Sequence, residues 1–222
     1  MLHLIIAESS LEIIPEEIKS HPSVVSHAHR LGKNSSEILL DNSWHFAAMK
    51  GIPDEIKRGR PDLVHFSVLE ATSIPLYYEN RINIFIHTIN DKVIYLGQNV
   101  HIPKSYHRFA GLMEKLFSEG SIISGDNQLL SIQDKSFKQL IDEIKPTQII
   151  GLSTMGKPSS FDQIASNLIE NSCIVIGGFQ KGHFSNAVQN YLPSLFSAGS
   201  RPLESHVVVA RILYEYEKTI FM

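Results

Sequence analysis

The sequence predicts one α/β domain with a largely parallel sheet. Short runs of apolar and β-branched residues recur along the chain, and amphipathic helical patterns separate them. The length of 222 residues suits one large domain, so we place residues 1–222 in a single domain. The strands that we expect are Leu2–Ala7, Ile82–His87, Val93–Leu96, Gln148–Leu152 and Cys173–Ile176.

The middle of the chain carries local strand and helix signals. Residues Ile82–Leu96 are typical of two strands joined by a polar turn. A helix should begin after Ser105, a favoured N-cap residue, and end at Gly120, a favoured stop. Its apolar residues recur at helical spacing and should form one buried face: Phe109, Leu112, Met113, Leu116 and Phe117. We expect approximately residues 73–131 to be an insertion within the domain, built from strands and a helix.

The last helix should span about Leu203 to Lys218. Its apolar residues spread around the whole circumference rather than along one face: Val207, Val208, Val209, Ile212 and Leu213. A helix that is apolar on all sides should be buried on most of them. In a chain of this length, a subunit interface is a natural second cover for such a helix.

The composition limits what the protein can be. With 43% hydrophobic and 19% charged residues, it is typical of a folded globular protein. The formal net charge of -3 excludes a protein that binds nucleic acid through its overall charge, so any nucleic-acid-binding surface must be a local patch. No apolar run approaches the ~20 residues that a membrane-spanning helix needs. No basic leader precedes the first expected strand, so we expect no signal peptide.

The cysteine and histidine content bears on compartment and metals. The single cysteine, Cys173, lies inside an apolar run and should be a buried thiol. A disulfide within the chain is impossible, which suits a reducing compartment, and we expect a cytoplasmic protein. His27 and His29 are spaced as metal ligands can be, but no third ligand lies near them in sequence. We therefore expect no metal site.

Two basic segments could contact a nucleic acid. In the first, Lys57–His65, Arg60 precedes a proline that can open a helix, and Asp62 falls in its first turn. An ion pair between Arg60 and Asp62 would hold the guanidinium for two-point binding of a phosphate. The second, His101–Phe109, places spaced basic residues at a helix start, and Tyr106 could stack on a base. An ordinary solvated basic surface is the alternative explanation for both segments.

A glycine-rich segment follows the last expected strand. Gly177, Gly178 and Gly182 come directly after the apolar run Cys173–Ile176. Glycines let the backbone approach a ligand closely and adopt a positive φ. The spacing differs from the dinucleotide-binding fingerprint, and no helix follows at once. The segment therefore predicts either a ligand-binding loop or a plain tight turn.

Taken in order, these segments resemble one family. They are similar to the archaeal-type Nep/Emg pseudouridine-N1 methyltransferases of the SPOUT superfamily, which act on ribosomal RNA in ribosome biogenesis. The resemblance covers essentially the whole chain. It rests on the order and spacing of five segments: Gly59–His65, Ile86–Thr88, Ile102–Met113, Ile176–Gly182 and Leu213–Glu217.

The resemblance implies a fold and an activity. The implied fold is a SPOUT-type α/β domain with a trefoil knot near the C-terminus, an exception to the usual absence of knots. The implied activity is methyl transfer from S-adenosylmethionine to N1 of a pseudouridine in small-subunit (16S/18S-type) ribosomal RNA. The implied partners are that RNA and a second copy of the chain, with neither membrane nor metal. The alternative is a non-catalytic RNA-binding ribosome assembly factor, which would need no cofactor pocket.

The resemblance also implies roles for individual residues. Arg60, His101, Lys104 and Arg108 stand at positions that contact RNA. Asp62 stands at the position that orients Arg60. Its alternative role is to accept the N1 proton, but a carboxylate paired with an arginine is a poor base. The positions that bind S-adenosylmethionine are Leu152, Gly177, Gly178, Gly182, Phe196, Ser197, Ala198, Gly199, Ser200 and Arg201.

Overall fold

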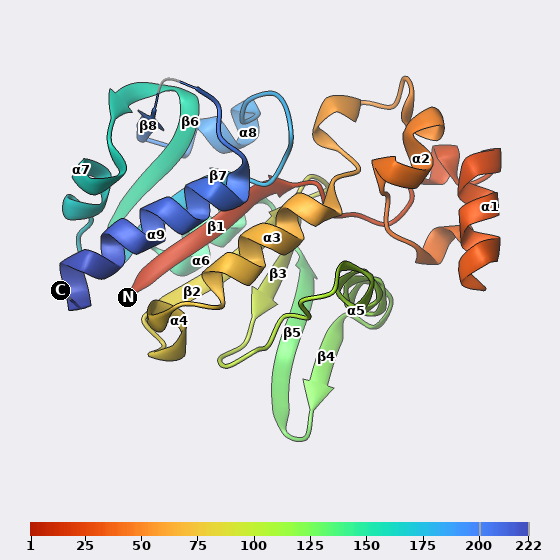
Figure 1. Ribbon diagram of the computed structural model, residues 1–222, viewed down its shortest axis with the longest axis horizontal. Coiled ribbons are helices and arrows are strands. Elements are labelled where there is room, and N and C mark those ends of the chain that lie inside the picture. The colour runs from red at the N-terminus through yellow and green to blue at the C-terminus, as the bar shows by residue number, and fades with distance from the viewer. Residues whose placement is uncertain (200, 222) are drawn as a thin grey trace.

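The computed structural model describes residues 1–199 and 201–221. The described residues form one eight-stranded sheet with helices on both faces (Figure 1). Its strands, from one edge to the other, run in the order β4-β5-β3-β2-β1-β7-β6-β8. The strands are β1 (Leu2–Ser9), β2 (Ile82–Thr88), β3 (Lys92–Leu96), β4 (Ser121–Ser124), β5 (Asn127–Asp134), β6 (Gln148–Ser159), β7 (Ser172–Gly177) and β8 (Ser194–Ala198).

Nine α-helices and three short 3-10 helices connect these strands within the described ranges. The α-helices are α1 (Pro22–Leu31), α2 (Asn42–Met49), α3 (Pro61–Ala71), α4 (Pro75–Tyr78), α5 (Tyr106–Glu119), α6 (Phe137–Ile144), α7 (Phe161–Ser166), α8 (Asn186–Gln189) and α9 (Ser205–Phe221). The 3-10 helices are η1 (Glu16–Ile18), η2 (Ser35–Glu37) and η3 (Glu55–Lys57).

The sheet has a parallel part and an antiparallel part. Strands β2, β1, β7, β6 and β8 pair in parallel, whereas β3, β5 and β4 continue the sheet beyond β2 in antiparallel pairs. All five expected strands are present, so the α/β prediction is confirmed. The sequence did not predict β4, β5 and β8, because polar residues interrupt their apolar runs. The assignment of residues 73–131 as a family-specific insertion stays a prediction.

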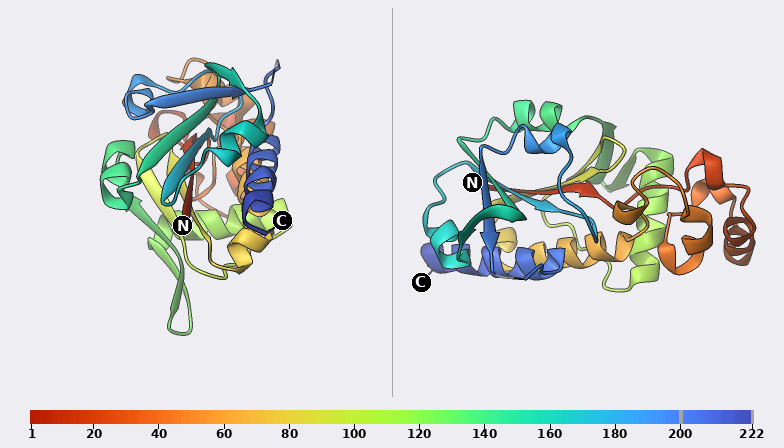
Figure 2. Two further views of the ribbon diagram at one scale, coloured as in Figure 1. Left: turned by 90° about the vertical axis from the view of Figure 1, so that its left-hand side faces the viewer. Right: turned by 90° about the horizontal axis from the view of Figure 1, so that it is seen from above.

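Alternate residues of the central strands face two different helical layers. In β1, Leu2 and Leu4 pack in the core that includes α9, whereas Ile5 and Ala7 pack in the core that includes α6 and α8. The view from above shows α3 and α9 along one face of the sheet and α6 and α8 along the other (Figure 2). Because both faces are covered, the central part of β1 and most of β7 are apolar on both faces, as is typical of parallel sheets. Cys173 lies in this core and is fully buried, as the sequence predicts.

Of the two helices that the sequence predicts, α5 matches the prediction and α9 is less buried than predicted. Helix α5 follows Ser105 and ends at Gly120, whose φ of 76° is left-handed. Its predicted apolar face is confirmed, because Phe109, Met113 and Leu116 are buried against the sheet and α3. Helix α9 begins two residues later than expected and buries one face only within the described chain. Tyr214 on its outer face is 54% exposed, so a single chain does not bury α9 on most sides.

Between β1 and α3, the chain forms a separate lobe that contains α1 and α2 (Figure 1). This lobe has its own apolar core and a hydrogen-bonded pair of histidines, buried His45 and half-buried His27. The ring of His45 accepts a hydrogen bond at Nδ1 from the Asp41 N–H, 3.0 Å away. Its proton therefore lies on Nε2, which donates to Nδ1 of His27 at 3.0 Å. Burial, together with the nearby His27, lowers the pKa of His45 to about 4.

We expect the His45 pair to make the protein acid-sensitive. In the unfolded chain His45 takes up a proton near its ordinary pKa of 6.5, but the folded protein resists this until about pH 4. Acid therefore favours the unfolded state, and about 2 to 3 kcal/mol of stability should be lost between pH 7 and 4.5. Urea unfolding at both pH values should show a smaller loss for His45→Gln, which keeps a donor and an acceptor but cannot titrate. An equal loss in both proteins would contradict this assignment.

Candidate active site

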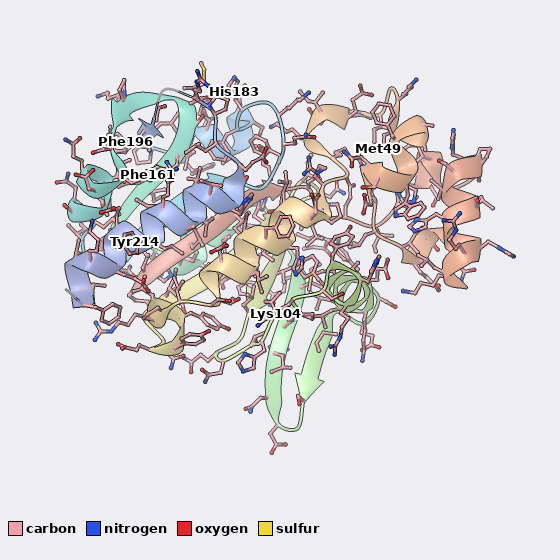
Figure 3. The ribbon with its side chains drawn as sticks, viewed as in Figure 1. Met49, Lys104, Phe161, His183, Phe196 and Tyr214 are labelled. Carbon is pink, nitrogen blue, oxygen red and sulfur yellow. The ribbon has the colours of Figure 1, made fainter. Side chains whose placement is uncertain are left out.

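A cavity of about 370 Å³ lies where β7 and β8 end and where the pairing of β6 with β7 stops. Gly177 and Ala198, the last residues of β7 and β8, line it together with Leu152, the last residue of β6 that pairs with β7. Residues from α7 and the first turns of α9 complete the wall, near the labelled Phe161 in Figure 3. Ligands of open parallel sheets bind outside the carboxyl ends of the strands. The cavity therefore stands where this fold class places a binding site.

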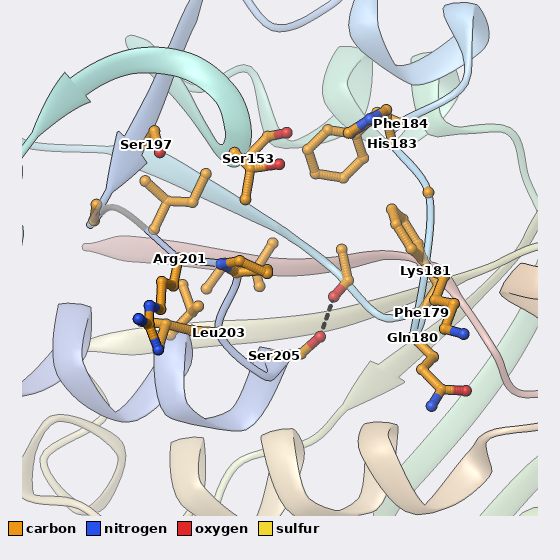
Figure 4. A pocket seen from close by; sticks show the side chains of 18 of the residues that line it. Ser153, Phe179, Gln180, Lys181, His183, Phe184, Ser197, Arg201, Leu203 and Ser205 are labelled. Atoms are coloured by element: carbon orange, nitrogen blue, oxygen red, sulfur yellow. Dashed lines mark hydrogen bonds between the residues drawn. The ribbon is translucent and has the colours of Figure 1, made fainter.

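The cavity combines an apolar floor with a polar and cationic rim. Leu152, Ile176 and Val208 supply apolar surface, and Lys181 and Arg201 supply charge (Figure 4). Neither Asp nor Glu lines the cavity within the described ranges. Small-molecule pockets have this combination of apolar surface with a few polar groups. The charges suit a ligand that carries a carboxylate, and the apolar surface suits an aromatic ring.

One hydrogen bond joins α9 to the glycine loop, the glycine-rich segment at residues 177–182. The Ser205 hydroxyl, at the start of α9, donates to the carbonyl oxygen of Gly177 at 2.5 Å (Figure 4). A side chain at Gly177 would begin 2.8 Å from the Phe179 ring, which itself lines the cavity. Position 177 thus lets the backbone run directly along the cavity wall.

The structure places the residues expected to bind a cofactor in three groups. Six of them line the cavity: Leu152, Gly177, Gly182, Ser197, Ala198 and Arg201. Phe196 lies in β8 and Gly199 directly after it, but neither residue lines the cavity. Ser200 lies outside the described residues. Gly178 faces the other way, since a Cβ there would lie 2.4 Å from Oγ of Ser9 in β1. Its glycine is required by close packing on β1 rather than by the cavity.

Sequence reasoning missed several residues that line the cavity. Ser153 and Thr154 follow the paired part of β6, and Gln180, Lys181 and His183 lie in the loop after β7. The sequence contained a clue to the residues after β6 and to those after β7. The carboxyl-end rule points to whatever follows each predicted strand, and the loop between Gly178 and Gly182 belongs to the same segment as the glycines.

A second site is built around Arg60, the residue before α3. Nε and Nη2 of Arg60 each donate to one oxygen of Asp62 at 2.8 Å. This pairing raises the pKa of the Arg60 guanidinium. The backbone N–H of Arg60 donates to Oγ of Ser10, 2.7 Å away, so the chain is fixed as well as the side chain. A guanidinium held by its own carboxylate keeps one edge free and a fixed orientation toward an anion.

The segment before α5 is held against α3. Nε2 of buried His65 donates to the carbonyl oxygen of Pro103 at 2.7 Å, and its ring stacks on Phe109. Burial lowers the pKa of His65 and so favours the neutral ring. Lys104, labelled in Figure 3, is exposed beside this contact. His101 and Arg108 are exposed in the same segment, so the three basic side chains are accessible on the α5 side of α3.

Stacking on a base would require an accessible Tyr106 ring, but Tyr106 is packed against the rest of the protein. Its hydroxyl donates to the Asp41 carboxylate, and burial, together with this bond, raises its pKa. The side chain is half-buried between the lobe and α5. Tyr106 therefore joins the lobe to α5, and the expectation that it is available to stack is wrong for this arrangement.

The comparisons with known proteins all point to one family over nearly the whole chain. A model of the family described as EMG1/NEP1 methyltransferase matches residues 4–217. The chain belongs to this family. A protein named Ribosomal RNA small subunit methyltransferase Nep1 from Thermococcus onnurineus is 39% identical over 98% of this chain and 98% of its own. Its counterpart from Thermococcus kodakarensis is 38% identical over 99% of both chains.

A solved structure of the EMG1/NEP1 family has the same fold. The crystal structure of Archaeoglobus fulgidus Nep1 bound to S-adenosylhomocysteine matches with a TM-score of 0.87 and 34% identity. The match covers 97% of this chain and 96% of the other. The expected SPOUT-type α/β fold is confirmed. The trefoil knot stays a prediction.

Of the helices within residues 1–199 and 201–221, none is both long and apolar enough to cross a bilayer. Within the same ranges, His, Cys, Asp and Glu side chains do not gather in any group of three that could hold a metal ion. His27, half of the HxH pair in the sequence, instead bonds to His45.

Proposed function

We propose that this chain is an S-adenosylmethionine-dependent methyltransferase that methylates N1 of a pseudouridine in small-subunit ribosomal RNA. The observation that carries the proposal is the cavity beside the glycine loop, in a chain that aligns end to end with the S-adenosylhomocysteine-bound relative. With ribosomal RNA as the substrate, we propose the cytoplasm as its place of action. A non-catalytic assembly factor would have no use for this cavity.

The residues of the cavity fit the proposed cofactor. The volume of about 370 Å³ falls within the range of roughly 300–1,000 Å³ that small-molecule sites occupy. The apolar surface of Leu152 and Ile176 suits the adenine ring, and Lys181 and Arg201 suit the carboxylate of the amino acid part. The bare backbone at Gly177 allows close approach. When bound there, S-adenosylmethionine supplies a methyl group activated on a sulfonium sulfur.

The RNA side of the proposal uses the cations near α3 and α5. Arg60, His101, Lys104 and Arg108 would contact phosphates, and Asp62 would hold Arg60 in orientation. The target base must be extruded from its RNA context to reach the cofactor cavity. Transfer would form a bond between N1 and the methyl carbon while the bond from that carbon to sulfur breaks, and the N1 proton would pass to solvent. Both oxygens of Asp62 are already bonded to Arg60, which favours the orienting role. Most of the rate gain then comes from orientation of N1 toward the methyl group.

The proposal includes a homodimer. Helices α3 and α9 lie side by side (Figure 1) and leave the large apolar residues Phe66 and Tyr214 exposed. An apolar surface on a folded chain is a typical interaction site. Sedimentation equilibrium should give the mass of two chains. A monomer at micromolar concentration would contradict this part of the proposal.

Binding of S-adenosylhomocysteine tests the cavity directly. Gly182 lines it with a φ of 102°, which side chains rarely adopt, and a Cβ there would lie 3.3 Å from Cε of Lys57. We expect Gly182→Ala to weaken binding about tenfold in calorimetry, because the loop must shift. Gly32→Ala is the matched control: Gly32 also has a positive φ of 65°, but it caps α1 with open space around it. Wild-type affinity in Gly182→Ala would count against the site.

A further inference from the structure

Glu8, at the carboxyl end of β1, is a buried carboxylate on an unusual backbone. Its φ is 49°, and the residue is 6% exposed. The pairing of β1 with β2 shifts register between Ile6 and Ser9, around this residue. Side chains with a Cβ seldom adopt the left-handed region, and such outliers persist where the surrounding structure enforces them, often at functional sites. The outlier at Glu8 therefore calls for a reason beyond the pairing of strands.

The contacts of the Glu8 carboxylate reach two distant segments. Both of its oxygens accept from the backbone N–H of Ser185, at 3.1 and 3.2 Å. Nζ of Lys57 donates to Oε2 at 2.9 Å, and the same Nζ lies 4.7 Å from the centre of the Phe179 ring. A buried charge is stable only when it is paired and hydrogen-bonded, and these partners meet that need.

Ser185 marks the end of the loop that forms one wall of the cavity. All of residues 179–184 line the cavity, and among the described residues they take part in no backbone–backbone hydrogen bond. The start of the loop is fixed at Gly178, whose N–H donates to Ala7 and whose carbonyl accepts from Ser10, both at 2.8 Å. The end is fixed by Glu8. The wall is thus a span whose two ends are both fixed to residues 7–10, at the carboxyl end of β1.

We propose that Glu8 is a positioning residue that sets the shape of the cofactor loop. Its carboxylate holds the end of the loop through Ser185 and its beginning through Lys57 and Phe179. The left-handed backbone at residue 8 interrupts the regular strand geometry where the carboxylate meets the loop. This inference rests on the proposed function, because it assigns Glu8 a part in binding the cofactor.

Glu8→Gly separates positioning from folding. Glycine adopts a positive φ freely, so the substitution relieves the backbone while it removes the clamp. We expect S-adenosylhomocysteine to bind about tenfold more weakly, or worse, because a bond from a backbone N–H to a charged acceptor is lost. The KM for S-adenosylmethionine should rise by a similar factor, with kcat near wild type at saturation. Glu8→Gln should lose less, because its amide oxygen can still accept from Ser185.

Glu12→Gln is the matched control. Glu12 is buried like Glu8. Its two carboxylate oxygens each accept a hydrogen bond from Arg58, the residue after Lys57, at 2.7 Å. It makes no bond to the loop at 178–185, so Glu12→Gln should lower the melting temperature but leave the cofactor affinity unchanged. Glu8→Gly with wild-type affinity, or Glu12→Gln with an equal loss of affinity, would overturn the role of Glu8. A wild-type protein that does not bind S-adenosylhomocysteine would instead refute the proposed function.

Discussion

Two RNA stem-loops that differ at a single nucleotide should be methylated only when that nucleotide is pseudouridine. In uridine, N1 forms the bond to ribose, so it has no proton to exchange for a methyl group. In pseudouridine the base is attached through carbon, and N1 carries a proton. Because the acceptor atom is absent in uridine, the expected effect is complete loss of product. Mass spectrometry of both RNAs after incubation with S-adenosylmethionine gives the measurement.

Binding of the two stem-loops provides the control for this experiment. The cations near α3 and α5 should contact phosphates, which both RNAs share, so both should bind with similar affinity. A uridine stem-loop that binds but does not react isolates the chemistry from recognition. Equal methylation of both RNAs would sink the assignment to N1 and leave a methyltransferase with another acceptor atom.

Replacement of Arg60, Lys104 or Arg108 by Ala should weaken RNA binding in a salt-dependent way. If each cation neutralises one phosphate, each replacement should make the plot of log binding constant against log salt concentration less steep by ~0.7 on single-stranded RNA. Arg60→Ala should be the most damaging, because it also leaves the Asp62 carboxylate without its partner. Affinity for S-adenosylhomocysteine should hardly change, since none of the three lines the cavity.

A control for this series lies on the opposite face of the sheet. Lys138 is an exposed lysine on α6 and forms an ion pair with Asp142 one turn away. Lys138→Ala changes the net charge by the same amount as each test variant. It should keep the wild-type salt slope. If the three test variants also keep that slope, the α3–α5 surface does not hold RNA, and its cations are ordinary solvated charges.

The sequence predicted the strands of the parallel core because their apolar runs are continuous. It also pointed to the loop at residues 178–185 that borders the cavity, because glycines follow a buried strand there. It could not show which way each glycine faces. Gly177 and Gly178 are neighbours, yet one borders the cavity and the other packs on Ser9, a contact between segments far apart in sequence. The clamp at Glu8 was invisible for the same reason, since its partners are Lys57 and Ser185.

The central place of β1 determines when the domain can fold during synthesis. The first strand of the chain pairs on one side with β2, Leu2 opposite Ile82, and on the other with β7, His3 opposite Cys173. At the roughly 5–20 residues per second of translation, on the order of ten seconds separates synthesis of β1 from that of β7. Throughout that interval an apolar strand has an open edge that other chains could pair with. Strand β1 therefore has both of its neighbours only after residues 172–177 of β7 have been synthesised.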